Sequence, residues 1–436
     1  MFEGGLHPSF GVDALSGFFL AVLATIAVPV LIYMRGYLRG THHGSAIAAL
    51  TFLFIGALVL VVTARDIVTF LAGWEVMTLI PAAIILVNRA DRPTRRTAFI
   101  YLAVTHVGGV GVWLTLLQLT FVGRPSGVIA TVVLVTAALV GFGTKAGLMP
   151  FHSWLPRAHP SAPSPVSALM SGVMIKVALY GLIRVILASG INPVVWGESL
   201  LALGVVSAIG GVVYALFQHE LKQLLAFHSI ENIGIIAMGL GSWLLLEGQG
   251  QRFWSGVAFV AAMLHVLNHA VFKSLLFMGA GAIERATQAH DLDRIGGLPA
   301  VSVFILIVGF TALLTWVRGA RTAAPAPAWT SGQTIDLSLG WTSSGFTKPL
   351  RLGWQWLLRP QNELAVVRSH AIVRSVTYRG DVPHLFDTAL YSPLLKTAAA
   401  WTGHVRRLQS GSLRTYSIYL SALVVFALAL LRLGLL

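Results

Sequence analysis

Apolar runs of about 20 residues follow one another along most of this chain, and each is long enough to cross a lipid bilayer as a helix. Of the 436 residues, 56% are hydrophobic and 11% are charged, whereas soluble domains are about one quarter charged. We therefore expect an all-α polytopic membrane protein in the inner (plasma) membrane of a prokaryote. About 11 transmembrane helices are expected, near residues 16–34, 44–63, 66–87, 97–121, 127–149, 166–188, 198–218, 223–246, 254–282, 299–317 and 416–435.

The basic residues of the loops predict the orientation of these helices. One set of loops carries most of them: Arg35, Arg39, Arg89, Arg92, Arg95, Arg96, Arg157, Lys222, Arg285 and Arg294. The alternate loops carry Arg65, Arg124 and Arg252. Because basic loops remain in the cytoplasm, the first set is expected inside and the N-terminus outside. The formal charge of +14 then reflects topology, and we expect no nucleic-acid partner.

Cysteine is absent from the sequence. This excludes disulfides, cysteine-ligated iron–sulfur clusters and cysteine-based zinc sites in this chain. We expect no cofactor here, so that any redox centre belongs to a partner subunit.

Lysines occur inside the apolar runs, where charged residues are rare. Lys145, Lys176 and Lys273 fall within expected spans, and Lys222 lies at the edge of one. Arginine essentially never releases its proton, whereas desolvation can lower the pKa of a lysine by several units. Lysines in these positions are therefore typical of groups that take up and release protons inside a membrane.

Two glutamates lie near the centres of expected spans. Glu75 occurs in "DIVTFLAGWEVMTLIPAAIILV" and Glu231 in "LLAFHSIENIGIIAMGLGSWLLL". A charge at the centre of a bilayer costs about 2.5–3.5 kcal/mol even on the mildest scale, so each requires a partner or water. Pairing of Glu75 with Lys145 would offset both costs and couple their protonation. The alternative is a static pair that fixes helix packing. Asn232 is expected to hold water or to stabilise the Glu231 carboxylate.

The stretch "HVLNHAVFK" places His265, His269 and Lys273 four residues apart, on one face of a helix. One interpretation is a proton relay, since histidine titrates near neutrality. The alternatives are a polar contact between helices and a zinc site completed by further ligands. His106 is a lone histidine in an apolar run, and we expect a packing role for it.

A break is expected shortly after Lys145. Pro150 cannot continue a helix, and backbone groups released at a break inside a membrane require water or protein partners. The stiff loop "PSAPSP" follows, and Ser164 and Pro165 are expected to begin the next helix.

Together, these motifs resemble the antiporter-like membrane subunits of respiratory complex I, Mrp-type antiporters and membrane-bound hydrogenases. The resemblance rests on "GTKAGLMPFHSWLPRAHPSAPSPVSALMSGVMIKVALYGLIR", "GWEVMTLIP" and "HELKQLLAFHSIENIGII". The wording "HSIENIG" and "HVLNHAVFKSLLFMGAGAI" is most similar to the large membrane subunit of hydrogenase-4 and formate hydrogenlyase.

The resemblance implies a proton path along the chain. Glu75 and Lys145 correspond to the paired glutamate and lysine of the family's proton channel, and Lys176 to its next central lysine. The remaining members of the path are Lys222, Glu231, His265, His269 and Lys273. The resemblance also implies partners, namely other membrane subunits and a soluble redox arm with nickel–iron, iron–sulfur or flavin centres.

The resemblance also suggests how the chain is divided. Residues 1–298 form the antiporter-like core, 299–317 a further helix, 318–412 a polar and amphipathic linker, and 413–436 a C-terminal helix. Within the linker, the stretch "FDTALYSPLLKTAAAWTGHVRRLQSG" is expected to form an amphipathic helix on the membrane surface. Family members usually have two helices before Asp13 and several after "DLDRIGGL". By this comparison an odd number of helices is absent, among them the second broken helix near the proton exit.

Three functions remain open from the sequence. The first is a proton-translocating, non-redox subunit of a hydrogenase-4-like or complex I-like oxidoreductase. The second is an Mrp-type cation/proton antiporter subunit, in which the ion is a proton or sodium. The third is a structural subunit that lacks the exit half-channel and translocates nothing.

Overall fold

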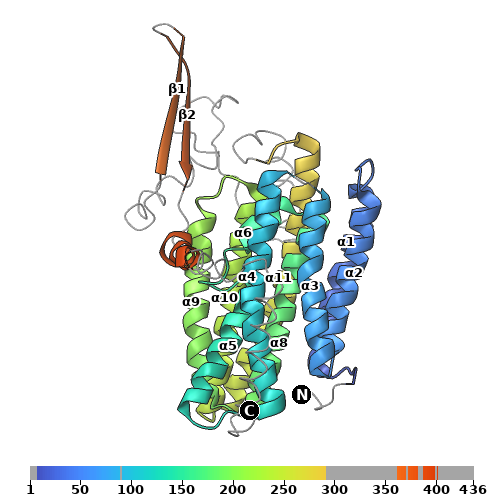
Figure 1. Ribbon diagram of the computed structural model, residues 1–436, viewed down its shortest axis with the longest axis vertical. Coiled ribbons are helices and arrows are strands. Elements are labelled where there is room, and N and C mark those ends of the chain that lie inside the picture. The colour runs from blue at the N-terminus through green and yellow to red at the C-terminus, as the bar shows by residue number, and fades with distance from the viewer. Residues whose placement is uncertain are drawn as a thin grey trace, which may run out of the picture. The chain divides into compact units, whose positions relative to one another are not determined.

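A computed structural model describes residues 7–88, 91–290, 361–369, 372–381, 386–397 and 400 of the chain. The chain divides into two compact units, Met1–Trp354 and Gln355–Leu436. All candidate site residues named above belong to the first unit, which is a bundle of helices standing side by side (Figure 1).

Within the described residues, nine segments are long and apolar enough to cross a membrane, as expected from the sequence. They are α1 (Ala14–Tyr37), α2 (Gly44–Thr63), α3 (Ile67–Asn88), α4 (Arg92–Leu117) with the π-helical turn η1 (Gln118–Val122), α5 (Val128–Ala146), the segment Ser164–Ser189, α9 (Pro193–Ala215), α10 (Leu221–Gly248) and α11 (Arg252–Thr287). The expected helices at 299–317 and 413–436 lie outside the described residues.

Polar residues at the loop junctions explain where several helices begin. The Asp13 carboxylate accepts a hydrogen bond from the Ser16 backbone N–H, and Asp91 does the same for Thr94. Side chains of this kind satisfy backbone donors that have no partner within the helix. We call the end of the bundle where α1, α3, α9 and α11 finish the inner end, because its loops carry the larger basic set. The opposite end is called the outer end.

The expected break after Lys145 is present, but Pro150 does not cause it. Helix α5 ends at Ala146, and Gly147 adopts the left-handed conformation with φ of 84°. The backbone N–H of Gly147 and that of Leu148 both bond the Gly143 carbonyl at 2.9 Å. A glycine in this conformation is a common helix terminator, because a side chain there would be strained. The short helix α6 (Leu155–Ser161) follows.

The segment Ser164–Ser189 is the central helix of the bundle. It comprises α7 (Ser164–Leu169), the π-helical turn η2 (Met170–Met174) and α8 (Ile175–Ser189). Every residue of its most apolar 18-residue stretch is buried. It packs against α1, α2, α5 and α11. Because this helix is surrounded by the others, Lys176 is fully buried.

The second unit contains an element that the sequence analysis did not foresee. Strands β1 (Gln361–Ser369) and β2 (Ile372–Asp381) pair antiparallel as a hairpin, with an irregularity between Val367 and Arg368. The helical turn η5 (Asp387–Tyr391) and a helical stretch to residue 397 follow. The expected helix within the linker is thus partly observed, and its location on the membrane surface stays a prediction.

Candidate functional site

Glu75 is held between α3 and α4 and does not contact Lys145. Its carboxylate lies 3.3 Å from the Nε2 atom of His106 and accepts a hydrogen bond of 3.3 Å from the indole N–H of Trp113. The side chains of Glu75 and His106 are 30% and 44% exposed. The expected packing role for His106 was therefore wrong, since this histidine faces the acid.

Lys145 is buried within α5 and is bonded by two hydroxyl groups. Its Nζ atom donates to Thr78 Oγ1 at 2.8 Å and to Tyr101 Oη at 3.3 Å. Tyr101 in turn donates to the Thr78 carbonyl at 3.0 Å. Glu75 acts on the Lys145 ammonium only through space. The expected direct ion pair of Glu75 and Lys145 is not formed. In the described part of the chain, the lysine contacts the Thr78 and Tyr101 hydroxyls and the glutamate contacts His106.

Lys176 is bonded to the backbone of its own helix. Its Nζ atom donates to the Ser171 carbonyl, which lies in the π-helical turn η2. A π-helical turn interrupts the regular bonding of the helix and frees carbonyl groups for such contacts. The Ser171 hydroxyl in turn bonds the Ser229 hydroxyl of α10 at 2.9 Å. The turn thus links the central helix to α10 next to the lysine.

The histidines of α11 share one face, as the spacing predicted. The rings of His265 and His269 are 6.4 Å apart and nearly parallel. His265 Nε2 bonds Asn232 Oδ1 of α10 at 3.1 Å. His269 is fully buried, and neither of its ring nitrogens has a hydrogen-bond partner among the residues that the structure describes. Lys273, one turn further along, is 1% exposed.

Glu231 is paired with a histidine that the sequence analysis did not single out. Its carboxylate lies 2.6 Å from Nδ1 of His228, three residues earlier on α10. Asn232 does not stabilise this carboxylate, because its amide bonds His265 and the His228 carbonyl. The spacing of His228 and Glu231 on one helix face was a signal available in the sequence.

Lys222, at the start of α10, forms a buried ion pair with Glu284 at 2.8 Å. The sequence analysis missed Glu284, which lies near the end of α11 beside basic loop residues. It also missed His159, whose ring is fully buried in the break region and stacks on Phe277 with centroids 4.6 Å apart. Lys176, Lys222 and Lys273 all act electrostatically on this histidine.

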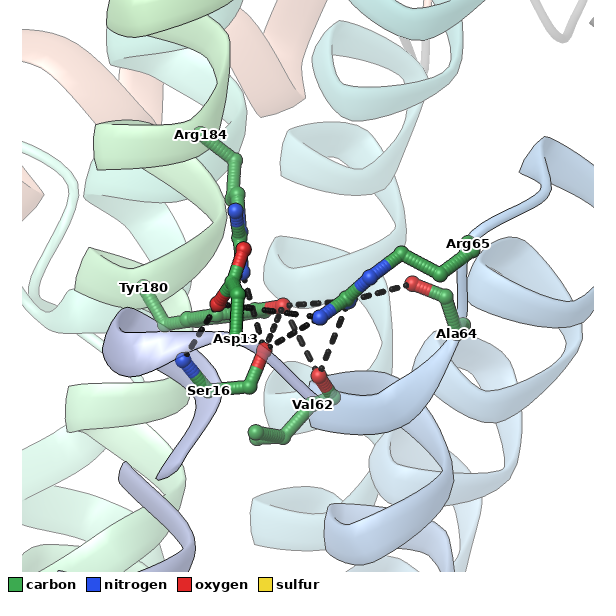
Figure 2. A network of polar contacts seen from close by, with 7 residues as sticks. All are labelled: Asp13, Ser16, Val62, Ala64, Arg65, Tyr180 and Arg184. Carbon is green, nitrogen blue, oxygen red and sulfur yellow. Dashed lines mark hydrogen bonds and ion pairs between the residues drawn. The ribbon is translucent and has the colours of Figure 1, made fainter. Parts of the chain in front are cut away.

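A separate polar network joins α1, α2 and α8 at the outer end (Figure 2). Asp13 pairs with Arg184 and lies 3.7 Å from Arg65. The hydroxyls of Tyr180 and Ser16 lie between them, 3.2 Å apart, and Tyr180 donates to the Val62 carbonyl at 2.8 Å. Hydrogen bonding and the charge of Arg184 hold the pKa of the Asp13 carboxyl well below its usual range. Lys176, Tyr180 and Arg184 share a face of α8, so this network caps the outer side of Lys176.

No three histidine, aspartate or glutamate side chains in the described residues lie close enough together to hold a metal ion. The zinc interpretation of His265 and His269 therefore has no support from this geometry. What the described residues do contain is a series of buried amines, imidazoles and hydroxyls that spans α3 to α11. Such groups exchange protons at modest energetic cost when water connects them.

Comparison with known proteins identifies the family. The transmembrane family model described as "NADH:quinone oxidoreductase/Mrp antiporter, TM" matches residues 64–320, which is more than half of the chain. The chain belongs to this family of antiporter-like membrane subunits. It is a multi-pass protein of the inner membrane, as the sequence predicted.

Individual relatives agree with this membership. An uncharacterized protein of Mycobacterium tuberculosis is 42% identical over 320 residues, covering 69% of this chain and 50% of that protein. Hydrogenase-4 component B of Escherichia coli is 36% identical over 305 residues, covering 66% of this chain and 45% of that protein. The structure of the Mrp complex from Dietzia sp. DQ12-45-1b matches with a TM-score of 0.55 and 28% identity, covering 64% of this chain and 31% of that one. The chain spans about half the length of the curated relatives it matches.

Proposed function

We propose that this chain is a proton-translocating membrane subunit of a hydrogenase-4-like or complex I-like oxidoreductase. The observation that carries the proposal is the burial of Lys145, Lys176 and Lys273 in three neighbouring parts of one bundle. Among the described residues none of these lysines touches a carboxylate. Desolvation favours the neutral form of an amine, so such groups suit the repeated loading and release of protons.

In this proposal the protein moves protons and its partners supply the energy. Redox chemistry in a soluble arm changes the charge near Glu75, which acts on Lys145 across the Thr78 and Tyr101 hydroxyls. The resulting change in the protonation of Lys145 then affects Lys176 and the histidines of α11. The absence of cysteine and the likeness to a hydrogenase component support the assignment of nickel–iron, iron–sulfur or flavin centres to other subunits.

The first test compares proton movement with electron transfer in inverted membrane vesicles that contain the parent complex. Lys145→Met is expected to abolish proton uptake while uncoupled electron transfer continues. Arg252→Gln, at the outer start of α11, is the matched control and is expected to behave as wild type. An unchanged ratio of protons to electrons in the Lys145 variant would contradict translocation by this chain and favour a structural role.

The second test identifies the partners. The tagged chain is purified gently from its own host, the bound subunits are identified by mass spectrometry, and hydrogen-dependent dye reduction is measured. Iron–sulfur and nickel–iron subunits with activity are expected. Purification of the chain with small membrane proteins alone would contradict the redox assembly.

The likeness to the Mrp complex supports a second candidate, a cation/proton antiporter subunit. The two functions differ in their need for an electron donor. If sodium or potassium collapses an imposed pH gradient in vesicles without any donor, and Lys145→Met prevents this, the antiporter is the correct assignment.

A further inference from the structure

The polar face of α11 continues beyond the residues of the proposed path towards the inner end. His265, His269 and Lys273 are spaced by four, the same spacing leads to Phe277 and Gly281, and Glu284 follows three residues later on the same face. Gly281 and Glu284 are both buried. Apart from Phe277, this face carries titratable or small residues from mid-membrane to the inner end, so it can line a route between the two.

Glu284 connects that face to the inner surface. One carboxylate oxygen lies 2.8 Å from Lys222 Nζ, and the other lies 3.3 Å from Nδ1 of His290. The side chains of Lys222 and Glu284 are 4% and 7% exposed, whereas that of His290 is 48% exposed. His290, Glu284 and Lys222 therefore form a connected series of charged or titratable side chains from the exposed surface to the interior of the bundle. Arg285 points away from it and bonds carbonyl groups at the end of α1.

Two buried hydroxyls face one point next to Gly281. A methyl group built at Gly281 would lie 2.6 Å from Ser164 Oγ and 2.8 Å from Tyr33 Oη. Both oxygens are buried, and neither has a hydrogen-bond partner in the described part of the chain. Buried polar atoms in proteins are nearly always hydrogen-bonded, to water if not to protein. The packing at Gly281 is close, since the same methyl group would overlap Ser164 Cβ, and the two unpaired hydroxyls meet beside it.

His159 extends the series towards the centre of the bundle. Its ring stacks on Phe277, and both of its nitrogens are buried without a hydrogen-bond partner within the described ranges. Lys222 donates to the carbonyl of Ala162, in the loop just after His159. Tyr33, Ser164 and His159 thus form a chain of groups that require water, between the Glu284 ion pair and the buried lysines.

Two hydroxyls at the outer end are satisfied by protein. The hydroxyls of Ser16 and Tyr180, which lie between Lys176 and the outer surface, are both hydrogen-bonded to protein. Arg184 Nε and Ser9 Oγ, also at the outer end, are buried without a hydrogen-bond partner among the described residues. What distinguishes the inner end is the buried ion pair of Lys222 and Glu284 that reaches the exposed His290.

We propose that Glu284, paired with Lys222 and exposed to water through His290, is the inner-side proton entry of this chain. A proton taken up by Glu284 neutralises its carboxylate and leaves the Lys222 ammonium unpaired, and Lys222 then passes its own proton to bound water leading to His159. Transfer from Glu284 to Lys222 restores the pair, so that one proton has moved inward. This step rests on the proposed translocation function, but the hydrated route itself does not.

X-ray hydroxyl-radical footprinting of the assembled complex tests the route directly. Oxidation of buried side chains reports water beside them. His159, which is fully buried, is expected to be oxidised, whereas Tyr180, at 1% exposure, is expected to be protected. The variant Gly281→Val, whose side chain would crowd and displace the Ser164 and Tyr33 hydroxyls, is expected to protect His159. If His159 is as protected as Tyr180 in the wild type, no water route exists and the proposal is overturned, whether or not the complex moves protons.

Proton uptake by vesicles tests the role of the acid. Glu284→Gln is expected to slow uptake by about ten-fold or more, because it removes the proton acceptor but keeps the shape. Glu284→Asp is expected to restore part of the rate. The control Glu198→Gln, an exposed acid of α9, is expected to be neutral. Should Glu284→Gln reduce assembly, His290→Asn at the surface is expected to slow uptake most at high pH, where protons are scarce.

These two readouts separate the outcomes. Normal uptake in an assembled Glu284→Gln complex would overturn the entry role while leaving the proposed function intact. If the wild type moves no protons but His159 is oxidised and Gly281→Val protects it, the hydrated route stands and the proposed function fails.

Discussion

At the scale of single residues, the buried lysines Lys145, Lys176 and Lys273 contact no carboxylate among the described residues, and the first two are bonded to neutral groups. Lys145 has the Thr78 and Tyr101 hydroxyls, and Lys176 has a carbonyl freed by a π-helical turn. Neutral partners bind an ammonium group less strongly than a carboxylate does. A lysine held in this way can lose its proton without leaving an unpaired acid beside it.

Thr78 is expected to matter for transport because it bonds Lys145 Nζ directly. Thr78→Val removes a buried hydrogen bond to a charged group, which is worth about 1.5–3 kcal/mol, at nearly constant shape. We expect slower proton uptake and a lower melting temperature of the purified complex. Thr78→Ser keeps the hydroxyl and is expected to resemble wild type. Equal uptake by the two variants would show that this contact has no part in transport.

Asp66, at the outer end of the bundle, makes the stability of the protein depend on pH. Burial alone raises the pKa of its carboxyl, but hydrogen bonds from the backbone N–H groups of Thr69 and Ser9, both 2.7 Å, outweigh burial and hold the pKa below its ordinary value. Because the folded pKa is lowered, this stabilisation is complete above the ordinary value of 3.8 and is lost as the pH falls through the folded value.

Asp66→Asn is therefore expected to flatten the acid limb of stability without abolishing folding, since the amide oxygen can still accept the bond from the Thr69 N–H although the bond from the Ser9 N–H is lost. Melting temperatures of the purified protein between pH 3 and pH 7 measure this. An acid limb as steep as that of the wild type would mean that another carboxyl controls it.

At the scale of elements, glycines decide how closely the helices approach. Gly197, Gly204 and Gly211 are seven residues apart on α9 and face α10. A methyl group at Gly204 would lie 2.8 Å from the Gly234 carbonyl, and one at Gly211 would lie 2.5 Å from the backbone nitrogen of Glu231. Small residues allow such close contact between membrane helices. The position of Glu231 is thus set by a residue on another helix.

Gly204→Leu is expected to separate α9 from α10 and to lower the melting temperature and the yield of the assembled complex. Gly56→Leu on α2 is the matched control, because a side chain at that exposed position meets no atom within 4 Å. The two variants share the same change in helix propensity. Equal losses in both would show that the close packing of α9 and α10 is unimportant.

At the scale of the whole bundle, the basic loops predict which end faces the cytoplasm. The chain has no cysteine, so single cysteines can be introduced without a background signal. Ser126→Cys and Gln251→Cys, in outer loops, are expected to react with an impermeant maleimide in intact cells. His42→Cys, in the loop between α1 and α2, is expected to react only after the membrane is opened. The reverse pattern would invert the bundle and move the Glu284 group to the outer surface.

Much of the fold followed from local patterns. The nine spans described by the structure were predicted because an apolar run of about 20 residues has few alternatives to a membrane helix. The common face of His265 and His269 was predicted because helical spacing alone determines it. The break after Lys145 was expected, but its cause was assigned to Pro150 and not to Gly147.

The sequence by itself therefore determined the class of protein, the order of its helices and the lysines buried among them. Only the tertiary structure added Glu284 and His159 and decided which residues meet. It placed Glu75 beside His106 and away from Lys145, paired Lys222 with Glu284, and left the ring nitrogens of His159 and His269 without hydrogen-bond partners among the described residues. Contacts between residues distant in sequence depend on helix rotation and on the depth of each helix in the bundle. Small shifts in the packing of neighbouring helices change both, and the residues of one helix do not encode them.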